Sequence, residues 1–495
     1  MNKLFNIKGD PFAKLSAEEE REYLTKIFYK QRYYDSLLSL AEASVSRFVL
    51  GQRGQGKSAT ILHLFEDMKS SGYLPILIDR YDGYPLQDNK NYFLYSMIQA
   101  ITFKIAKSLM DYPYKKKSLN AVQKVHLAFF IEAFYEKETA EECIYQASNI
   151  RNKRFFNRFK IWINNNLSFL NGVLDLSLKV GAELIKSVLG IDNIDTAGMR
   201  KDLIRELAIE EYHTLSMSEI VQWETSKLIK VLNNLIEITC AMNYKSVVVM
   251  FDKIDEVPGI NADIEKVTTF MYDFLTDNNL LYTPKLSIVV SLWSEVKKSL
   301  NKRGVRFDKF KEIDIRWTNE ELIEMMNKRL FYYSIDKRNP VTLNSLVPDK
   351  NHLDIILELA DRSPRSLINL LGYILYEEQS NNIQEFSVDA LTKGYMMYSR
   401  KFDYVSAQPS RTGKGSDLTS WITRLLRIKL SQFTLEQYMA NFNIKKNIGQ
   451  KHIETLIQFN LIRDSLYQSD KGDIKYEVCD PRIRYLINRG VQDLD

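Results

Sequence analysis

The chain has 495 residues, of which 45% are hydrophobic and 26% charged, and its formal net charge is +5. This length predicts about two to four domains, and the composition excludes a largely disordered chain. The small charge excess permits a local basic patch but does not by itself indicate nucleic acid. Cys143, Cys240 and Cys479 lack zinc or disulfide spacing, and no apolar run reaches about 18 residues, so we expect a cytoplasmic protein without a membrane span.

Residues 1–44 predict a helical lead-in before the first strand. The segment includes GDPFAKLSAEEEREYLTKIFYKQRYYDSLLSL, which turns acidic where a signal peptide would carry its apolar run. We therefore treat it as part of the folded protein.

A phosphate-binding loop follows a short apolar strand, Ser46–Leu50. The sequence GQRGQGKS has the form G-x-x-x-x-G-K-[ST], and a helical pattern comes directly after it. In this context we expect Lys57 to reach phosphate oxygens and the Ser58 hydroxyl to bind Mg²⁺. The alternative is a glycine turn with a chance lysine. The predicted nucleotide-binding residues are Gly51, Gln52, Arg53, Gly54, Gln55, Gly56, Lys57, Ser58 and Ala59, with Ser291 from a later strand.

Tyr73–Gly83 predicts a second strand, and an insertion of mostly helical character then extends over about residues 103–226. Within it, RNKRFFNRFK interleaves basic and aromatic residues, which suits nucleic acid or an acidic partner. An amphipathic helix with solvated charges is the alternative. Val173–Leu184 alternates apolar and polar residues in its first half, which favours a hairpin or edge strand.

The stretch SVVVMFDKIDE supplies a carboxylate at the end of a second buried strand, Val247–Phe251. Asp252 is the predicted magnesium-side acid. Lys253 occupies the position where hydrolytic P-loop enzymes often carry a glutamate, so the role of base passes to Asp255 or Glu256. A solvated loop is the alternative for these two acids.

Two further strands complete the predicted sheet. KLSIVVSLW reaches Ser291, whose hydroxyl could contact a γ-phosphate through a water, and Phe310–Trp317 is the last strand. Buried strands separated by helices predict a doubly wound α/β sheet over residues 45–317, with the nucleotide at its carboxyl edge.

Residues 318–403 predict a helical lid. In DRSPRSLINLLGYIL, Pro364 favours the first turn of a helix, and Arg365 can then project into the nucleotide cleft. A capped helix with a surface arginine is the alternative.

After a linker at Tyr404–Asp417, residues 417–495 predict three helices, a β-hairpin and a last helix. Lys445, Lys446 and Lys451 cluster at the start of the third helix, where they could meet DNA phosphates or base edges. The helix itself is poor in residues that read bases, so a packing role remains open.

Together these motifs resemble P-loop ATPases of the additional-strand class, near the Orc/Cdc6-like AAA+ and the STAND switch ATPases. The form D-x-h-D-E in VVVMFDKIDE is more similar to STAND and KAP-type ATPases than to typical AAA+ proteins. The resemblance implies that the lead-in lies beside adenine, that Arg365 is a second-sensor arginine and that the C-terminal domain is a winged helix. It also implies an arginine finger for a neighbouring subunit at Arg306, although a solvated arginine is equally open.

Two functions fit this organisation. The first is an ATP-binding and hydrolysing switch that controls self-assembly or recruitment of an effector protein, a context that the resemblance places in bacterial antiviral defence. The second is an Orc/Cdc6-like initiator or loader that binds DNA through the winged helix and the basic insertion. A nucleotide-binding scaffold with negligible turnover is a third reading.

Overall fold

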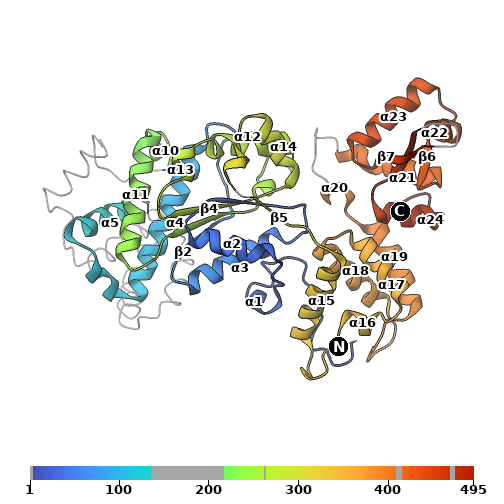
Figure 1. Ribbon diagram of the computed structural model, residues 1–495, viewed down its shortest axis with the longest axis horizontal. Helices are drawn as coiled ribbons and strands as arrows, with labels where there is room; N and C mark the ends of the chain where they lie inside the picture. Colours follow the sequence, from blue (N-terminus) through green and yellow to red (C-terminus); the bar gives the residue numbers. More distant parts are fainter. Residues whose placement is uncertain are drawn as a thin grey trace, which may run out of the picture.

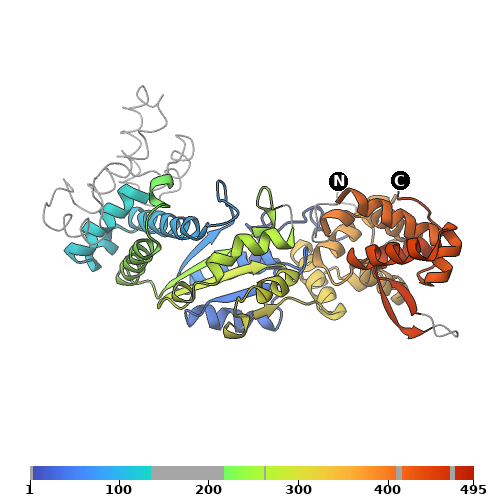
Figure 2. The same ribbon diagram turned by 90° about the horizontal axis from the view of Figure 1, so that it is seen from above.

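The computed structural model describes residues 4–134, 217–260, 263–310, 312–407, 415–468 and 474–494. These residues form an elongated molecule with a central sheet, the helices α5 (Ala121–Phe134) and α11 (Thr225–Ala241) toward one end and the C-terminal domain at the other (Figures 1 and 2). Most of the predicted insertion, including RNKRFFNRFK and the alternating pattern at Val173–Leu184, lies outside the described residues.

A five-stranded parallel sheet forms the centre, with the strand order β2-β3-β4-β1-β5. One strand, β4, lies between β1, which precedes the phosphate loop, and β3, which Asp252 follows. The predicted α/β parallel sheet of a P-loop ATPase is thereby confirmed. The strands are β1 (Arg47–Leu50), β2 (Leu74–Ile78), β3 (Val247–Phe251), β4 (Leu286–Leu292) and β5 (Glu312–Asp314).

Helices cover both faces of this sheet, which explains why its strands are continuous apolar runs. Val247, Val249 and Phe251 of β3 belong to one core cluster, together with α4 (Lys90–Asp111), α11 and α12 (Ile264–Leu275). Val248 and Met250 belong to the other, together with α2 (Tyr33–Glu42) and α3 (Lys57–Ser70). Short elements between them are η1 (Pro113–Ser118), α10 (Met217–Ile220), η4 (Ile254–Glu256), α13 (Asn278–Leu281), α14 (Ser294–Lys302) and η5 (Phe307–Lys309).

The lead-in is attached to the lid as well as to the sheet. Before its first helix, α1 (Leu24–Ile27), isolated bridges pair Leu4 with Ile383 and Ile7 with Ser334. The N-terminus accordingly lies beside the lid helices (Figure 1).

The lid is a group of five helices that begins directly after the last strand of the sheet. Its elements are α15 (Asn319–Tyr333), α16 (Leu343–Leu346), α17 (Lys350–Ala360), α18 (Pro364–Glu377) and α19 (Val388–Lys401). Helix α18 begins where SPRS predicts: the Ser363 hydroxyl accepts a hydrogen bond from the Ser366 amide, and Pro364 occupies the first turn.

The C-terminal domain has the helices and small sheet of a winged helix. Its three-stranded sheet has the order β6-β8-β7, so the predicted hairpin gains a third strand of only three residues, which the sequence did not indicate. The elements are α20 (Tyr404–Ala407), α21 (Gly415–Ile428), β6 (Gln432–Thr434), α22 (Leu435–Phe442), α23 (Lys446–Gln458), β7 (Ile462–Gln468), β8 (Ile474–Val478) and α24 (Pro481–Asn488).

The winged helix is fastened to the lid through Arg482. This buried guanidinium forms ion pairs with Asp480 at 2.6 Å and with Asp361 of the lid at 3.3 Å, and it stacks 3.7 Å over the Phe402 ring. At the edge of the same contact, Arg484 pairs with Glu358 of α17 at 2.9 Å. The lid and the winged helix therefore form one connected unit.

Within the described ranges, none of the helices combines the length and the apolar character that crossing a bilayer requires.

Candidate nucleotide-binding site

The phosphate loop has the backbone conformation that its glycines permit. Gly54 has φ +81° and Gly56 has φ +92°, both in the left-handed region, and Gly56 caps α3. The Gln55 side chain accepts a hydrogen bond from the Gln52 amide at 2.8 Å, and the Trp317 indole donates to the Gln55 carbonyl at 2.9 Å. These contacts hold the loop in a turn that ends at the helix N-terminus.

Lys57 lies over this loop. Its ammonium donates to the carbonyls of Gly51 at 3.0 Å and Gln52 at 3.1 Å. Burial lowers the pKa of Lys57, while the nearby carboxylates of Asp255 and Asp252 act in the opposite direction. An anion bound beside Lys57 would stabilise its charged form, which is the electrostatic requirement of a phosphate site.

Asp252 follows β3 and is 4% exposed. Burial raises the pKa of Asp252, and the adjacent hydroxyls of Ser58 and Ser291 oppose this shift. Ser291 Oγ is itself buried, yet within the described residues it meets no hydrogen-bond partner in good geometry. The site thus contains a buried acid, Asp252, beside a buried hydroxyl, Ser291 Oγ, whose hydrogen bonding is incomplete within the described residues.

These residues fit a nucleoside triphosphate with Mg²⁺. Ser58 and Asp252 would hold the ion, whose remaining ligands are normally phosphate oxygens and waters instead of a cage of protein groups. Among the described residues, no group of three or more His, Cys, Asp or Glu side chains is arranged to hold a metal ion.

Two further carboxylates, Asp255 and Glu256, lie on η4 and line the same cavity. Burial, followed by the charge of Asp255, raises the pKa of Glu256. Lys253 has φ +59° and forms an ion pair with Glu18 of the lead-in at 2.8 Å. Lys253, at the position where a glutamate is usual, therefore connects the end of β3 to the lead-in. The acids Asp255 and Glu256 lie in the turn that follows.

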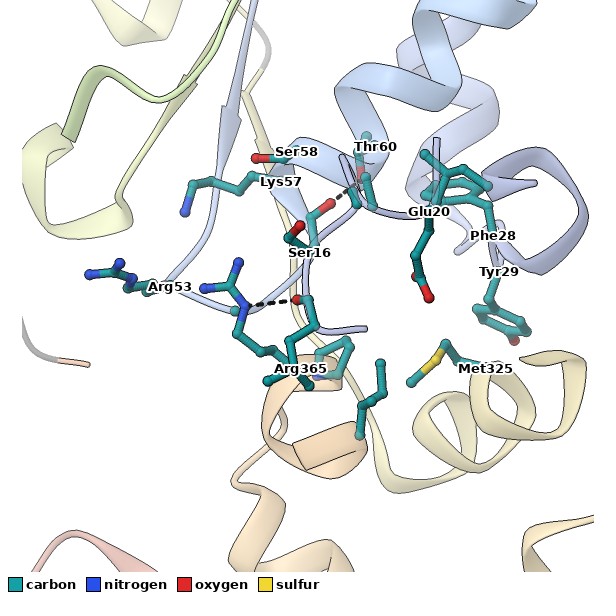
Figure 3. A pocket seen from close by; sticks show the side chains of 18 of the residues that line it. Ser16, Glu20, Phe28, Tyr29, Arg53, Lys57, Ser58, Thr60, Met325 and Arg365 are labelled. Carbon is teal, nitrogen blue, oxygen red and sulfur yellow. Dashed lines mark hydrogen bonds between the residues drawn. The ribbon is translucent and has the colours of Figure 1, made fainter. Parts of the chain in front are cut away.

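The lid contacts the phosphate loop directly at Gly54. The carbonyl of Gly54 accepts hydrogen bonds from the Ser363 hydroxyl and the Arg365 amide, both at 3.3 Å. A Cβ atom on Gly54 would come within 2.7 Å of Ser363 Oγ. The Arg365 side chain lines the cavity and donates to the carbonyl of Leu15 at 3.2 Å (Figure 3). The start of α18 is thus seated on the loop.

Arg53 extends this contact to the winged-helix side. Its guanidinium donates to the carbonyl of Ser406 at 3.0 Å, in the short helix α20 that precedes the winged helix. Its charge also counteracts the raised pKa of Glu256. One phosphate-loop residue therefore connects the acids of the site with the C-terminal domain.

The cavity has two chemically different ends. Lys57, Ser58, Arg53 and Arg365 lie at the phosphate end, whereas Glu20, Phe28, Tyr29 and Met325 lie at the other (Figure 3). This second end, which we call the base end, combines lead-in and lid residues, and Phe28, Tyr29 and Met325 supply its aromatic and apolar surface.

The structure brings most of the predicted site residues to this cavity. Its lining includes Arg53, Gly54, Gly56, Lys57, Ser58, Ala59, Asp252, Asp255, Glu256 and Arg365. Gly51, Gln52 and Gln55 shape the loop without lining the cavity, and Ser291 lies behind Asp252. Arg306 is exposed after α14 and is not part of the lining.

Sequence reasoning did not name Glu20, Trp317, Met325 or Arg329 as lining residues. The aromatic stretch FYKQRYY in the lead-in was a partial signal for the base end. The lid residues Met325 and Arg329 gave no such signal in the sequence, because only the folded chain places α15 beside the lead-in.

No protein-family model matches the chain, and no curated protein sequence is significantly similar to it. Among solved structures, the chain is similar to the Walker-type ATPase PABY2304 of Pyrococcus abyssi, at 13% identity over 93% of this chain and 96% of that one, with a TM-score of 0.39. It is also similar to the Aeropyrum pernix ORC2 protein in ADPNP–ADP complexes, at 11% identity over 98% of each chain, with a TM-score of 0.40.

A third similar structure is the Aeropyrum pernix ORC1 protein in complex with DNA, at 10% identity over 94% of this chain and 96% of that one, with a TM-score of 0.35. One of these neighbours is thus a Walker-type ATPase and the other two are ORC proteins. TM-scores below 0.5 do not establish a shared function, so the geometry of the site carries the functional proposal.

Proposed function

We propose that the chain is an ATP-binding and hydrolysing switch of the AAA+/STAND type. The observation that carries this proposal is the direct seating of the lid on the phosphate loop. The carbonyl of Gly54 accepts from Ser363 and Arg365, and Arg53 reaches Ser406. The nucleotide-binding loop is therefore hydrogen-bonded to the parts of the chain that a switch would move.

At the phosphate end, each side chain has a role that follows from its position. Lys57 neutralises phosphate charge, the loop amides and the α3 N-terminus bind oxygens, and Ser58 and Asp252 hold Mg²⁺. When bound, Mg²⁺ supplies charge neutralisation on the phosphate oxygens. Asp255 or Glu256 orients and deprotonates the attacking water, a task that the raised pKa of Glu256 suits.

Arg365 links the phosphates to the lid. Its side chain lines the cavity, and its charge is close enough to Lys57 to contribute to the lowered pKa of that lysine. A contact between Arg365 and the terminal phosphate would exist only before hydrolysis. Loss of that phosphate would weaken the contact between the site and α18, so that the lid could move. The winged helix would move with the lid because the Arg482 ion pairs connect the two.

Assembly of several copies, or recruitment of an effector protein, is the output that we propose for this switch. Arg306 is exposed and does not line the cavity of its own chain. An arginine finger that reaches the nucleotide of a neighbouring copy would lie in such a position. We place the switch in bacterial antiviral defence on the resemblance to STAND-type ATPases.

The experiment that tests this function compares the full chain without nucleotide, with ADP and with a non-hydrolysable ATP analogue. Mass in solution and ATP hydrolysis are measured for the wild type and for Lys57→Ala and Asp252→Asn. We expect assembly that depends on the ATP analogue and hydrolysis that both substitutions abolish. Hydrolysis that survives both substitutions would contradict the assignment of the site.

The second candidate function is an initiator or loader that binds duplex DNA. Lys445, Lys446 and Lys451 are all exposed at the N-terminal part of α23, which favours contact with DNA phosphates. DNA binding that falls on neutralising Lys445 and Lys446, and that weakens steeply with salt, would support it. ATP-dependent assembly without DNA binding would leave the switch as the function.

A further inference from the structure

Lys253 lies between the magnesium-side acid and the acids of the following turn, yet its charge is directed to the lead-in. It lines the cavity, and its ammonium forms the ion pair with Glu18 at 2.8 Å. The backbone of Lys253 has φ +59°, in the left-handed region that is unfavourable for a residue with a Cβ atom. Such a conformation persists where surrounding contacts hold it, so the position of this lysine is imposed by the fold.

The acids around Lys253 come from three elements. Besides Glu18 of the lead-in, the charges of Asp79, which follows β2, and Glu256 of η4 act on the lysine. Burial, followed by the charge of Asp255, raises the pKa of Glu256, and the Lys253 ammonium acts in the opposite direction. Lys253 is thus within electrostatic reach of a candidate catalytic acid while it is paired with a different carboxylate.

A lysine paired with the acids of η4 would oppose the proposed reaction. The acid that deprotonates the attacking water needs a free lone pair and a pKa near the working pH. An ammonium bound to that carboxylate occupies its lone pairs and lowers its pKa, so the acid becomes a poorer base. The place at which Lys253 is held therefore affects whether the turn after β3 can activate water.

The ion pair with Glu18 contributes little stability of its own. The side chains of Lys253 and Glu18 are 26% and 37% exposed, and ion pairs at such exposure are strongly screened by solvent. A pair of this kind is readily exchanged for another. Its main consequence is the position that it gives to the ammonium.

The segment of the lead-in that carries Glu18 also contacts the lid. Glu19 accepts hydrogen bonds from the amides of Leu15 at 3.3 Å and Ser16 at 3.1 Å, which orders the turn. Arg365 of the lid donates to the carbonyl of Leu15 at 3.2 Å, and Ser16 lines the cavity (Figure 3). The same short segment is therefore bonded to the lid and to Lys253.

We propose that Glu18 is a positioning residue for ATP hydrolysis, which holds the Lys253 ammonium away from Asp255 and Glu256 while the lid is seated. The inference rests on the proposed function, in which one of these two acids activates water. When the lid leaves, the lead-in releases Lys253, and the lysine pairs with the acids and stops the reaction. Hydrolysis is thereby confined to the seated state of the lid.

The test measures phosphate release by the full chain in the wild type, Glu18→Ala, Lys253→Met and the double variant. We expect Glu18→Ala to lower kcat by about tenfold or more, because the released ammonium reaches the acids. Adding Lys253→Met to Glu18→Ala should restore kcat to within about threefold of the wild type, since no ammonium is left to release. Lys253→Met alone should behave like the double variant. Binding of a non-hydrolysable ATP analogue, measured in parallel, should be no weaker in Glu18→Ala, which shows that the site is still folded.

A merely structural ion pair predicts a different pattern. Each of the three variants loses the same pair, so all three would lose the same share of kcat, and that result would overturn the inference. An unchanged kcat in Glu18→Ala would mean that the released lysine turns to Asp79 or to solvent, and it would overturn the inference as well. Glu22→Ala, which removes an exposed charge from the same lead-in, is the matched control and should leave kcat unchanged.

Failure of the proposed function has its own signature. If the folded wild type neither binds the ATP analogue nor releases phosphate from ATP, the proposed function is wrong and the inference falls with it. Binding without hydrolysis removes the hydrolytic part of the proposed function, and the inference with it. Hydrolysis by the wild type that Glu18→Ala does not slow leaves the ATPase proposal standing and removes only the role of Glu18.

Discussion

The phosphate end and the base end of the cavity are built in different ways. The phosphate end comes mainly from one continuous loop and the first turn of α3, with Asp252 following β3 and Arg365 coming from the lid. The base end is assembled from lead-in residues such as Phe28 and lid residues such as Met325, which lie about 300 residues apart in the sequence. In the proposed function, the first end would hold phosphate mainly by backbone geometry, whereas the second is complete only while the lid is in place.

This difference gives the two ends different tasks. A bound triphosphate would be held by the loop whatever the lid does, but its base would be enclosed only when lead-in and lid are together. Ligand binding that depends on lid position also stabilises that position, by thermodynamic linkage. The base end, together with Arg365 of the lid, is therefore the part through which a nucleotide could favour one arrangement of lid and winged helix.

The largest effect is expected from separating the winged helix from the lid. Arg482→Ala removes a buried guanidinium that is paired with Asp480 and Asp361 and leaves the Asp480 carboxylate, which is 11% exposed, without its main partner. We expect the free energy of unfolding of the lid and winged helix to fall by about 3–5 kcal/mol in denaturant titrations. Arg484→Ala, whose partner Glu358 is exposed, should cost no more than about 1 kcal/mol. Equal effects of the two substitutions would contradict the assigned role of Arg482.

A substitution at Lys57 tests the phosphate end without changing the base end. Lys57→Ala removes the cation that faces the phosphates, and we expect hydrolysis to fall by about 100- to 1000-fold because transition-state charge loses a preorganised partner. Lys69→Ala, on the same helix but paired with Glu66 at the surface, is the control and should leave the rate unchanged. Steady-state phosphate release measures both variants. A normal rate in Lys57→Ala would place the chemistry elsewhere.

A buried histidine, His63, lies behind Phe28 of the base end and can change its protonation state with pH. His63 of α3 is buried, stacks on Phe28 with ring centroids 4.2 Å apart and lies 3.6 Å from Asp67. Burial lowers the pKa of His63 to about 4, although Asp67 opposes the shift. A group with a depressed pKa contributes stability above its unfolded value of about 6.5, and that stability is lost as the pH falls toward 4.

We therefore expect His63 to account for about 2 kcal/mol of lost stability between pH 7 and pH 5. His63→Phe keeps an aromatic ring against Phe28 and removes the titrating group. Denaturant unfolding at the two pH values should show a smaller loss for the variant than for the wild type. An identical pH dependence would mean that His63 is not protonated on unfolding in this range.

The smallest effect is expected where the lid meets the phosphate loop. Gly54→Ala adds a methyl group 2.7 Å from Ser363 Oγ on a residue with φ +81°. We expect a loss of about 1–2 kcal/mol in stability and easier opening of the lid. Gly72→Ala, which has φ +84° but open space around its Cβ position, controls for backbone strain alone. If the two variants lose stability equally and leave the lid unaffected, the contact at Gly54 does not hold the lid.

The sequence allowed much of the phosphate end to be predicted because that end is local. GQRGQGKS lies directly between β1 and α3, and the apolar run at Val247–Phe251 places Asp252 at the edge of the sheet. The start of α18 could also be predicted, since Ser363 and Pro364 are strong local signals for a helix N-terminus. In each case the information lies within a few residues.

The base end could not be predicted in the same way. Glu20 and Arg329 are more than three hundred residues apart, and nothing in either local pattern distinguishes them from surface charges. The contact of Arg53 with Ser406 is equally remote, because the loop and α20 meet only through tertiary structure. The strand β6 was missed for a related reason: its three residues form a strand only through pairing with β8.

The most direct test of the central claim measures amide hydrogen exchange at the seat of the lid. The segments 363–367 and 403–407 carry the contacts to Gly54 and Arg53. Exchange is followed in the wild type without nucleotide, with saturating ADP and with a saturating non-hydrolysable ATP analogue. The account predicts that both segments are more protected with the ATP analogue than with ADP. Equal protection in the two nucleotide states, with binding of both shown to be saturated, would contradict it.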